Sequence, residues 1–217
     1  MIKAIIFDFD GTMLETEMPE YASWQEVYQQ HQCELPISLW LEFVGKSVGT
    51  FDPYTHLESL VGRAIDRQAV RQVRRQRFNE LLGQQTILPG VEAALIFAKE
   101  AGIRLAVASS SSREWVVGHL EQFGLLSYFD AICTADDVDR AKPDPAVYRL
   151  ALERLGVAAH EAIAIEDSRN GLLAAKRAGL RCVVVPNALT CHSTFEEADL
   201  QVTSLAEVDW QQVCRAA

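Results

Sequence analysis

The segment IKAIIFDFDGT, residues 2–12, decides the fold of this chain. Five of the six residues at positions 2–7 are apolar, which indicates a buried β-strand. Two aspartates, Asp8 and Asp10, follow at once and are themselves followed by a glycine. Like charges close together repel each other unless something compensates them. We therefore ask which group compensates the two negative charges at the end of this strand.

Further strand-like segments follow in the second part of the chain, and helical segments separate them. Their apolar residues run without strict alternation, which is typical of parallel strands covered on both faces. The predicted strands are 103–109, 129–135, 162–167, 181–186 and 198–204. The predicted helices are 89–102, 111–124, 144–156 and 168–179, with Ser111 and Asp144 as caps at two of their starts. This order predicts an α/β fold, a doubly wound parallel sheet with a Rossmann-like core.

A different pattern occupies the region between the first strand and the rest of the sheet. Segments 19–32 and 66–83 look helical and amphipathic, and no strand pattern appears between them. We therefore expect a catalytic α/β core formed by residues 1–14 plus 86–217. Residues 15–85 are expected to form a small all-helical cap domain.

Composition excludes several classes of protein. Among 217 residues there are 30 acidic and 20 basic side chains, a formal charge of −10. This balance argues against nucleic-acid binding and against binding to anionic membrane surfaces. No apolar run approaches the roughly 20 residues that a membrane-spanning helix needs. The five scattered cysteines include no CxxC pair, so we expect neither disulfides nor zinc, and a cytoplasmic, reduced protein.

Polar residues follow the predicted strands at the points where the strands end. Because parallel strands end at one edge of a sheet, these side chains should converge in one crevice. They are four carboxylates, a hydroxyl and an ammonium: Asp8, Asp10, Glu166, Asp167, Ser109 and Lys142. Four carboxylates need a cation among them, and Mg²⁺ is the natural one because it prefers oxygen ligands. The set fits phosphoryl transfer through an aspartyl-phosphate.

Each of these features alone has a plain structural interpretation. The two aspartates could form a turn or a helix cap, Ser109 could be a cap, and Lys142 could be a solvated charge. Glu166 and Asp167 could simply favour the positive end of the following helix. It is the occurrence of four strand-end signals in one compatible order that favours a catalytic site.

Four motifs, in this order, resemble those of the haloacid dehalogenase superfamily. They are DFDGT at 8–12, VASSS at 107–111, AKPDP at 141–145 and IEDSRNG at 165–171, so the likeness spans essentially the whole chain. PEYASW at 19–24, together with the helical insert, resembles the β-phosphoglucomutase-like branch with its helical cap. Most members of that branch are Mg²⁺-dependent phosphatases of small phosphorylated metabolites, and the resemblance implies this activity here.

The resemblance also implies roles for the core residues. Asp8 would attack phosphorus and become phosphorylated. Asp10 would protonate the leaving oxygen and then deprotonate the water that hydrolyses the intermediate. Ser109 and Lys142 would hold the phosphoryl oxygens, and Thr12 would orient Asp10.

The implied metal site is built from the same acids. Mg²⁺ would take a carboxylate oxygen of Asp8, the backbone carbonyl of Asp10, and Asp167. Glu166 would be a further ligand or would lie just outside the ligand sphere. Candidates for contact with the substrate are Thr12, Ser110, Glu20 and Lys46, the last in a glycine-flanked loop of a cap expected to close over the crevice.

Rival functions remain open at this point. A sugar-phosphate mutase of the same branch would share every core residue, but it would carry a histidine at Glu20 and an arginine where residues 45–49 read GKSVG. Both departures favour a phosphatase. A haloalkanoate dehalogenase would need neither Asp10 nor the acids at 166–167.

Two non-hydrolytic alternatives come from other classes. A phosphoacceptor signalling domain places its metal-binding acids before the acceptor, the reverse of the order here. A catalytically inactive binding module would not need the complete set of acids and lysine. The expected partner is a small phosphorylated metabolite; its identity, and whether the protein is a monomer or a homodimer, stay open.

Overall fold

The computed structural model of the protein describes residues 1–43 and 51–215. The chain divides into two compact units. The core unit comprises Met1–Leu14 and Ile87–Ala217, and the helical unit comprises Glu15–Thr86. Among the described residues, none of the helices is long and apolar enough to cross a membrane.

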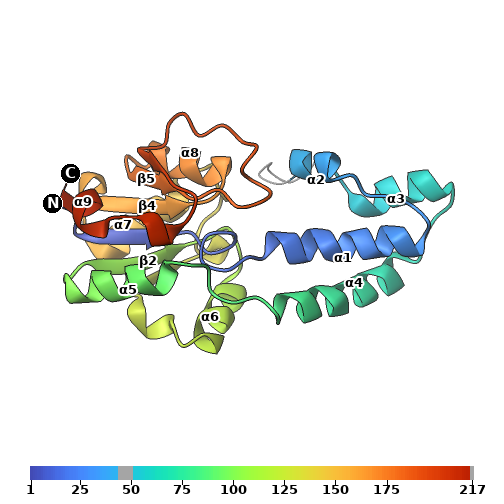
Figure 1. Ribbon diagram of the computed structural model, residues 1–217, viewed down its shortest axis with the longest axis horizontal. Helices are drawn as coiled ribbons and strands as arrows, with labels where there is room; N and C mark the ends of the chain where they lie inside the picture. The colour runs from blue at the N-terminus through green and yellow to red at the C-terminus, as the bar shows by residue number, and fades with distance from the viewer. Residues whose placement is uncertain (44–50, 216–217) are drawn as a thin grey trace. The chain divides into compact units, whose positions relative to one another are not determined.

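In the described part of the core unit, six strands form one parallel sheet (Figure 1). The strand order is β3-β2-β1-β4-β5-β6, with β1 in the interior. The expected α/β fold with a doubly wound parallel sheet is confirmed. The strands are β1 (Ala4–Phe7), β2 (Arg104–Ala108), β3 (Ala131–Cys133), β4 (Ala162–Glu166), β5 (Arg181–Val184) and β6 (Leu200–Gln201).

Strand β1 shows why this part of the sequence reads as an unbroken apolar run. All four of its residues are buried, because helices cover both faces of the sheet. Phe7 pairs with Val107 of β2 and with Ile165 of β4. Ala4 and Ile6 belong to the core cluster on the face covered by α7 (Ala146–Leu155) and α8 (Arg169–Arg177).

The remaining helices of the core unit complete the covering layers. Helix α5 packs against β2, and α6 packs against β3. Helix α9 is held to the start of the chain by a backbone hydrogen bond from Ile2 to Cys214, and it was not among the predicted helices. These helices are α5 (Val91–Glu100), α6 (Arg113–Gln122) and α9 (Trp210–Arg215).

Two predicted helix starts differ from the observed ones. Helix α6 is capped by Ser112, whose hydroxyl accepts from the Trp115 amide, rather than by Ser111. Helix α7 begins at Ala146, one residue later than expected, although the Asp144 carboxylate still accepts from the Ala146 amide at 3.0 Å. The first shift frees the Ser111 hydroxyl for another partner.

Asp137 ties the end of β3 to helices α6 and α7. Its carboxylate accepts from the Thr134 amide at 2.9 Å and forms ion pairs with Arg113 (2.8 Å) and Arg154 (2.9 Å). Burial opposes ionisation of this carboxyl, but the hydrogen bonds from Arg154, Thr134 and Arg113 outweigh it and hold the pKa of Asp137 well below its usual range. The carboxylate thus fixes the start of α6 in the fold.

We expect Asp137→Asn to lower the free energy of unfolding by about 1–2 kcal/mol at pH 7, since hydrogen bonds to a charged group are lost and both arginines are partly exposed. Because the folded-state pKa is lowered, this stabilisation is present above the unfolded-state pKa and is lost as the pH falls. The difference between the variant and the wild type should shrink below about pH 4. Urea unfolding across that range tests this, with Asp139→Asn at an exposed aspartate as the control. A difference that is constant with pH would contradict it.

The helical unit is built around the contact between α1 and α4, which lie side by side in Figure 1. Trp24 and Tyr28 of α1 are buried in this unit, and the Tyr28 hydroxyl contacts Pro53 and His56 of α3. The carboxylates of Asp52 and Asp66 cap α3 and α4 by accepting hydrogen bonds from backbone amides in the first turn of each helix. Helices α2 and α3 lie where the sequence showed no strand pattern, and they were not predicted. The helices are α1 (Glu17–Gln30), α2 (Ile37–Phe43), α3 (Pro53–Val61) and α4 (Arg67–Leu82).

Candidate active site

Three acids gather at the carboxyl edge of the sheet. Asp8 follows β1, Glu166 is the last residue of β4, and Asp167 comes next. One carboxylate oxygen from each lies within 4.8 Å of the other two, and all three residues are buried. Such a cluster of hard oxygen donors is the ligand chemistry that Mg²⁺ prefers, so the residues present fit this ion.

Lys142 bridges two of these acids. Its ammonium donates to Asp8 Oδ1 at 2.6 Å and to Glu166 Oε1 at 2.7 Å, and the residue is only 9% exposed. Tyr148 donates to the same Glu166 oxygen at 2.5 Å and lies under the Lys142 ammonium, 5.0 Å from Nζ to the ring centre. Sequence reasoning missed Tyr148, which carries no charge and lies within α7 rather than at the end of a strand.

The electrostatics of this cluster follow from burial and from the shared lysine. Burial raises the pKa of Asp8 to about 7, even though the Lys142 charge opposes the shift. Burial lowers the pKa of Lys142, but attraction to Asp8 and Glu166 outweighs this and leaves that pKa above its usual range. Burial and the neighbouring Glu166 charge raise the pKa of Tyr148 well above its usual value. The lysine therefore stays charged between two acids.

Asp10 has a different set of partners, although it is two residues from Asp8. Its Oδ2 accepts from Ser111 Oγ at 2.6 Å and lies 3.5 Å from Ser109 Oγ, while its Oδ1 accepts from the Trp115 indole at 2.9 Å. The structure therefore brings three of the four predicted carboxylates together and directs the fourth towards α6. Separate partners explain how two neighbouring acids coexist at the end of one strand.

Thr12 and Asn187 contact the acid cluster from two loops. The Thr12 hydroxyl lies 3.3 Å from Asp8 Oδ2 and 3.5 Å from Asp167 Oδ1, so it contacts these acids rather than Asp10. Asn187 donates to Asp167 Oδ2 at 2.7 Å. Sequence reasoning missed Asn187, although it follows β5 just as the predicted site residues follow their strands.

Two glycines let the backbone approach the acids closely. A Cβ atom on Gly11, whose φ is +76°, would lie 2.4 Å from Asp167 Oδ2. A Cβ atom on Gly171 would lie 1.8–2.0 Å from the carboxylate of Glu166. Only glycine therefore fits beside the acids at these two positions.

The serines after β2 differ in their surroundings. Ser109 is buried at the strand end, and its hydroxyl accepts from the Ser111 amide at 3.0 Å. Ser110, a predicted substrate contact, is exposed. Ser111, which was predicted as a helix cap, is instead the closest partner of Asp10.

In the helical unit, one predicted substrate residue has a charged partner. Glu20 forms an ion pair with Arg74 at 2.6 Å, and Arg74 also lies over the Trp24 ring at 5.1 Å. The Arg74 side chain is only 16% exposed. The other predicted residue of this unit, Lys46, lies outside the described residues.

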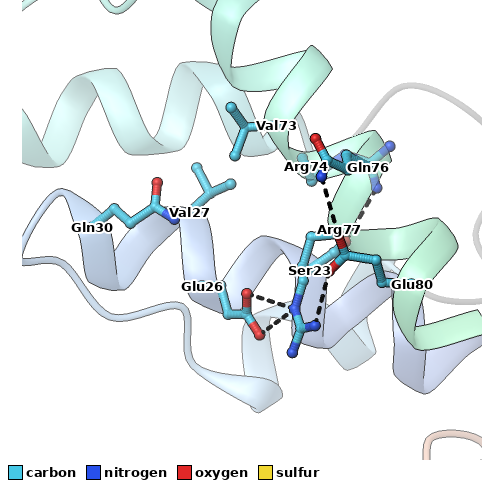
Figure 2. A pocket seen from close by; sticks show the side chains of 9 residues that line it. All are labelled: Ser23, Glu26, Val27, Gln30, Val73, Arg74, Gln76, Arg77 and Glu80. Atoms are coloured by element: carbon cyan, nitrogen blue, oxygen red, sulfur yellow. Dashed lines mark hydrogen bonds and ion pairs between the residues drawn. The ribbon is translucent and has the colours of Figure 1, made fainter.

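A pocket of about 210 Å³ is lined by α1 and α4 of the helical unit. Figure 2 shows Arg77 in this pocket, bound to Glu26 at 2.9 Å and to Glu80 at 3.1 Å. Arg74, the partner of Glu20, also lines it, but none of the predicted site residues does. Its charged groups therefore compensate one another.

Comparison with known proteins agrees with the motifs at the sheet edge. The model of the haloacid dehalogenase-like hydrolase family matches residues 5–185, which include every core residue predicted from the four motifs. The chain belongs to this family. The resemblance inferred from the four motifs is thereby confirmed, and the protein is an enzyme of the hydrolase class.

Relatives of this hydrolase cover nearly its whole length. "Putative phosphatase YhcW" of Bacillus subtilis (strain 168) is 46% identical over 209 residues, 96% of this chain and 94% of the relative. CbbY from Rhodobacter sphaeroides, solved in complex with phosphate, is 34% identical, with a TM-score of 0.75 over 96% of this chain and 97% of the other. A mutant of CbbY was solved with xylulose-(1,5)bisphosphate.

A third relative places the hydrolase in its branch. The crystal structure of a "putative beta-phosphoglucomutase" from Thermotoga maritima is 27% identical, with a TM-score of 0.81, and each chain covers 100% of the other. The resemblance to the β-phosphoglucomutase-like branch is therefore confirmed as well.

Proposed function

We propose that this hydrolase is a Mg²⁺-dependent phosphatase that cleaves the phosphate monoester of a small metabolite through an aspartyl-phosphate on Asp8. The observation that carries the proposal is the buried cluster of Asp8, Glu166 and Asp167, bridged by the Lys142 ammonium. A buried carboxylate beside a lysine and further acids suits attack on a phosphoryl group whose charge needs compensation.

The metal would be held by Asp8, Asp167 and the backbone carbonyl of Asp10, with Glu166 as a further or outer ligand. When bound, Mg²⁺ offsets negative charge on the acids and on the phosphoryl oxygens. Glu166 is already engaged by Lys142 and Tyr148 through one oxygen, whereas its other oxygen lies 3.4 Å from the Ser168 hydroxyl.

The reaction proceeds in two displacements. An oxygen of Asp8 bonds to phosphorus while the ester oxygen leaves with a proton supplied by Asp10. A water molecule then attacks the same phosphorus, Asp10 takes the proton of that water, and inorganic phosphate leaves Asp8. Ser109 and Lys142 hold the phosphoryl oxygens through both steps.

The substrate belongs to the small phosphorylated metabolites, and phosphorylated carbohydrates are the class that the complex of CbbY with xylulose-(1,5)bisphosphate supports. The five cysteines are free, which suits a reduced compartment, and we place the enzyme in the cytoplasm.

Glu20, where the resemblance to a mutase calls for histidine, favours the phosphatase.

Incubation with a panel of phosphorylated metabolites tests this function. We expect inorganic phosphate to be released with Mg²⁺, to fall at least about a hundredfold in excess chelator, and to return when Mg²⁺ is restored. Full activity in excess chelator would contradict the role of the metal.

The same assay distinguishes the mutase, which the Thermotoga neighbour keeps as a second candidate. Glucose 1-phosphate with a trace of the bisphosphate should yield phosphate rather than glucose 6-phosphate. Efficient isomerisation without phosphate release would overturn the hydrolytic assignment and leave the role of Asp8 standing.

A further inference from the structure

The Asp10 carboxylate is bound by donors from the segment that follows β2. Ser111 Oγ and Trp115 Nε1 lie 2.6 and 2.9 Å from its two oxygens. Each oxygen thus has its own donor, and this pair of contacts fixes both the position and the plane of the carboxylate. Trp115, which supplies the indole contact, lies outside the four motifs found in the sequence.

Trp115 is itself held firmly within the core unit. It lies in the first turn of α6, whose start is fixed by the Ser112 cap and by the contacts of Arg113 with Asp136 and Asp137. The ring of His119 lies 4.3 Å from the Trp115 ring, and its Nδ1 is 2.8 Å from the Trp115 carbonyl oxygen. The indole N–H is therefore aimed at Asp10 by the fold.

The contacts hold Asp10 next to the proposed phosphoryl site. Its Oδ2 lies 3.5 Å from Ser109 Oγ, the hydroxyl proposed to bind a phosphoryl oxygen. An indole N–H donates but cannot accept, so it can orient a carboxylate oxygen without taking part in proton transfer. Loss of this N–H would leave Asp10 Oδ1 without its donor and the plane of the carboxylate held only by the contacts of Oδ2 with Ser111 and Ser109.

We propose that Trp115 is a positioning residue that holds Asp10 for proton transfer to the leaving oxygen. This role rests on the proposed function, because it needs Asp10 to act as the acid. A misplaced Asp10 slows the departure of a poor leaving group, whereas a good leaving group departs without a proton. The loss of activity caused by removing the Trp115 N–H should therefore grow as the leaving group becomes less acidic and depends more on protonation.

The test compares Trp115→Phe with wild type on a series of aryl phosphates, from p-nitrophenyl phosphate to phenyl phosphate. The parameter is kcat/KM, which reports the steps up to release of the phenol. We expect a loss of about tenfold for phenyl phosphate and little loss for p-nitrophenyl phosphate, so the dependence on leaving-group acidity becomes steeper. Phenylalanine keeps the aromatic packing on His119 while deleting the N–H. Trp210→Phe, in α9, is the matched control and should leave the dependence unchanged.

A second variant pair separates positioning from damage to the fold. In the Asp10→Asn background, adding Trp115→Phe should cause no further loss, because the group that Trp115 positions is already gone. Equal losses on all esters, or a full additional loss in the double variant, would overturn the role of Trp115. If the wild-type enzyme released phosphate from no aryl ester and from no metabolite, the proposed function itself would be wrong, and the role of Trp115 would be wrong with it.

Discussion

Asp8→Asn should remove turnover, by a factor on the order of 10⁴ or more, and leave the fold intact. The amide oxygen is a poor nucleophile and cannot form the aspartyl-phosphate of the proposed reaction. It can still accept the hydrogen bond from Lys142, now 2.6 Å from Asp8 Oδ1. Burial raises the pKa of Asp8 to about 7, which means that the ionised form is costly in the fold. A neutral side chain of the same shape should therefore not lower the free energy of unfolding at neutral pH.

The measurement pairs steady-state phosphate release with urea unfolding of the same preparations. Asp139→Asn makes the same chemical change at an exposed position and should keep the wild-type rate. A near-normal rate in Asp8→Asn would remove this residue from the role of nucleophile. An inactive variant that has also lost cooperative unfolding would show that Asp8 holds the fold rather than the chemistry.

The parts of the site that could be predicted from the sequence are those placed by parallel strands. Asp8 and Glu166 follow from one rule, because the register of β1 with β4 brings Phe7 beside Ile165 and so brings the next residues together. Asp167 follows from the same rule. Asn187 also follows a strand, β5, and contacts Asp167. It was missed because an uncharged amide gives no sign in the sequence that it belongs with the acids.

The parts that could not be predicted depend on where a helix begins and which way it faces. Ser111 read as a cap because a glutamate follows three residues later, but the Ser112 hydroxyl takes that place. This shift of one residue decides that Ser111 and Trp115 reach Asp10. In the helical unit, pairing of Glu20 with Arg74 depends on the packing of α1 against α4, about which neither helix alone carries information.

Lys142→Met should separate charge compensation from catalysis. The substitution keeps most of the aliphatic stem but leaves Asp8 and Glu166 buried without the ammonium between them. Breaking a buried ion pair in this way costs about 3–5 kcal/mol of folding free energy. Turnover should fall about a thousandfold, since the phosphoryl oxygens also lose a cation.

The effect of Mg²⁺ on the stability of Lys142→Met should distinguish the loss of the ammonium charge from a simple packing defect. In the variant the three acids repel one another more strongly, so a divalent cation among them gains more electrostatic energy than in wild type. We therefore expect Mg²⁺ to raise the unfolding temperature of Lys142→Met by more than it raises that of wild type, while activity stays low. Lys176→Met is the control, because Lys176 forms only a partly exposed ion pair with Asp199 at 2.7 Å and should cost at most about 1 kcal/mol. If Mg²⁺ stabilised wild type and Lys142→Met equally, the lysine would not be sharing its acids with the metal, and its role would reduce to contact with the phosphoryl group.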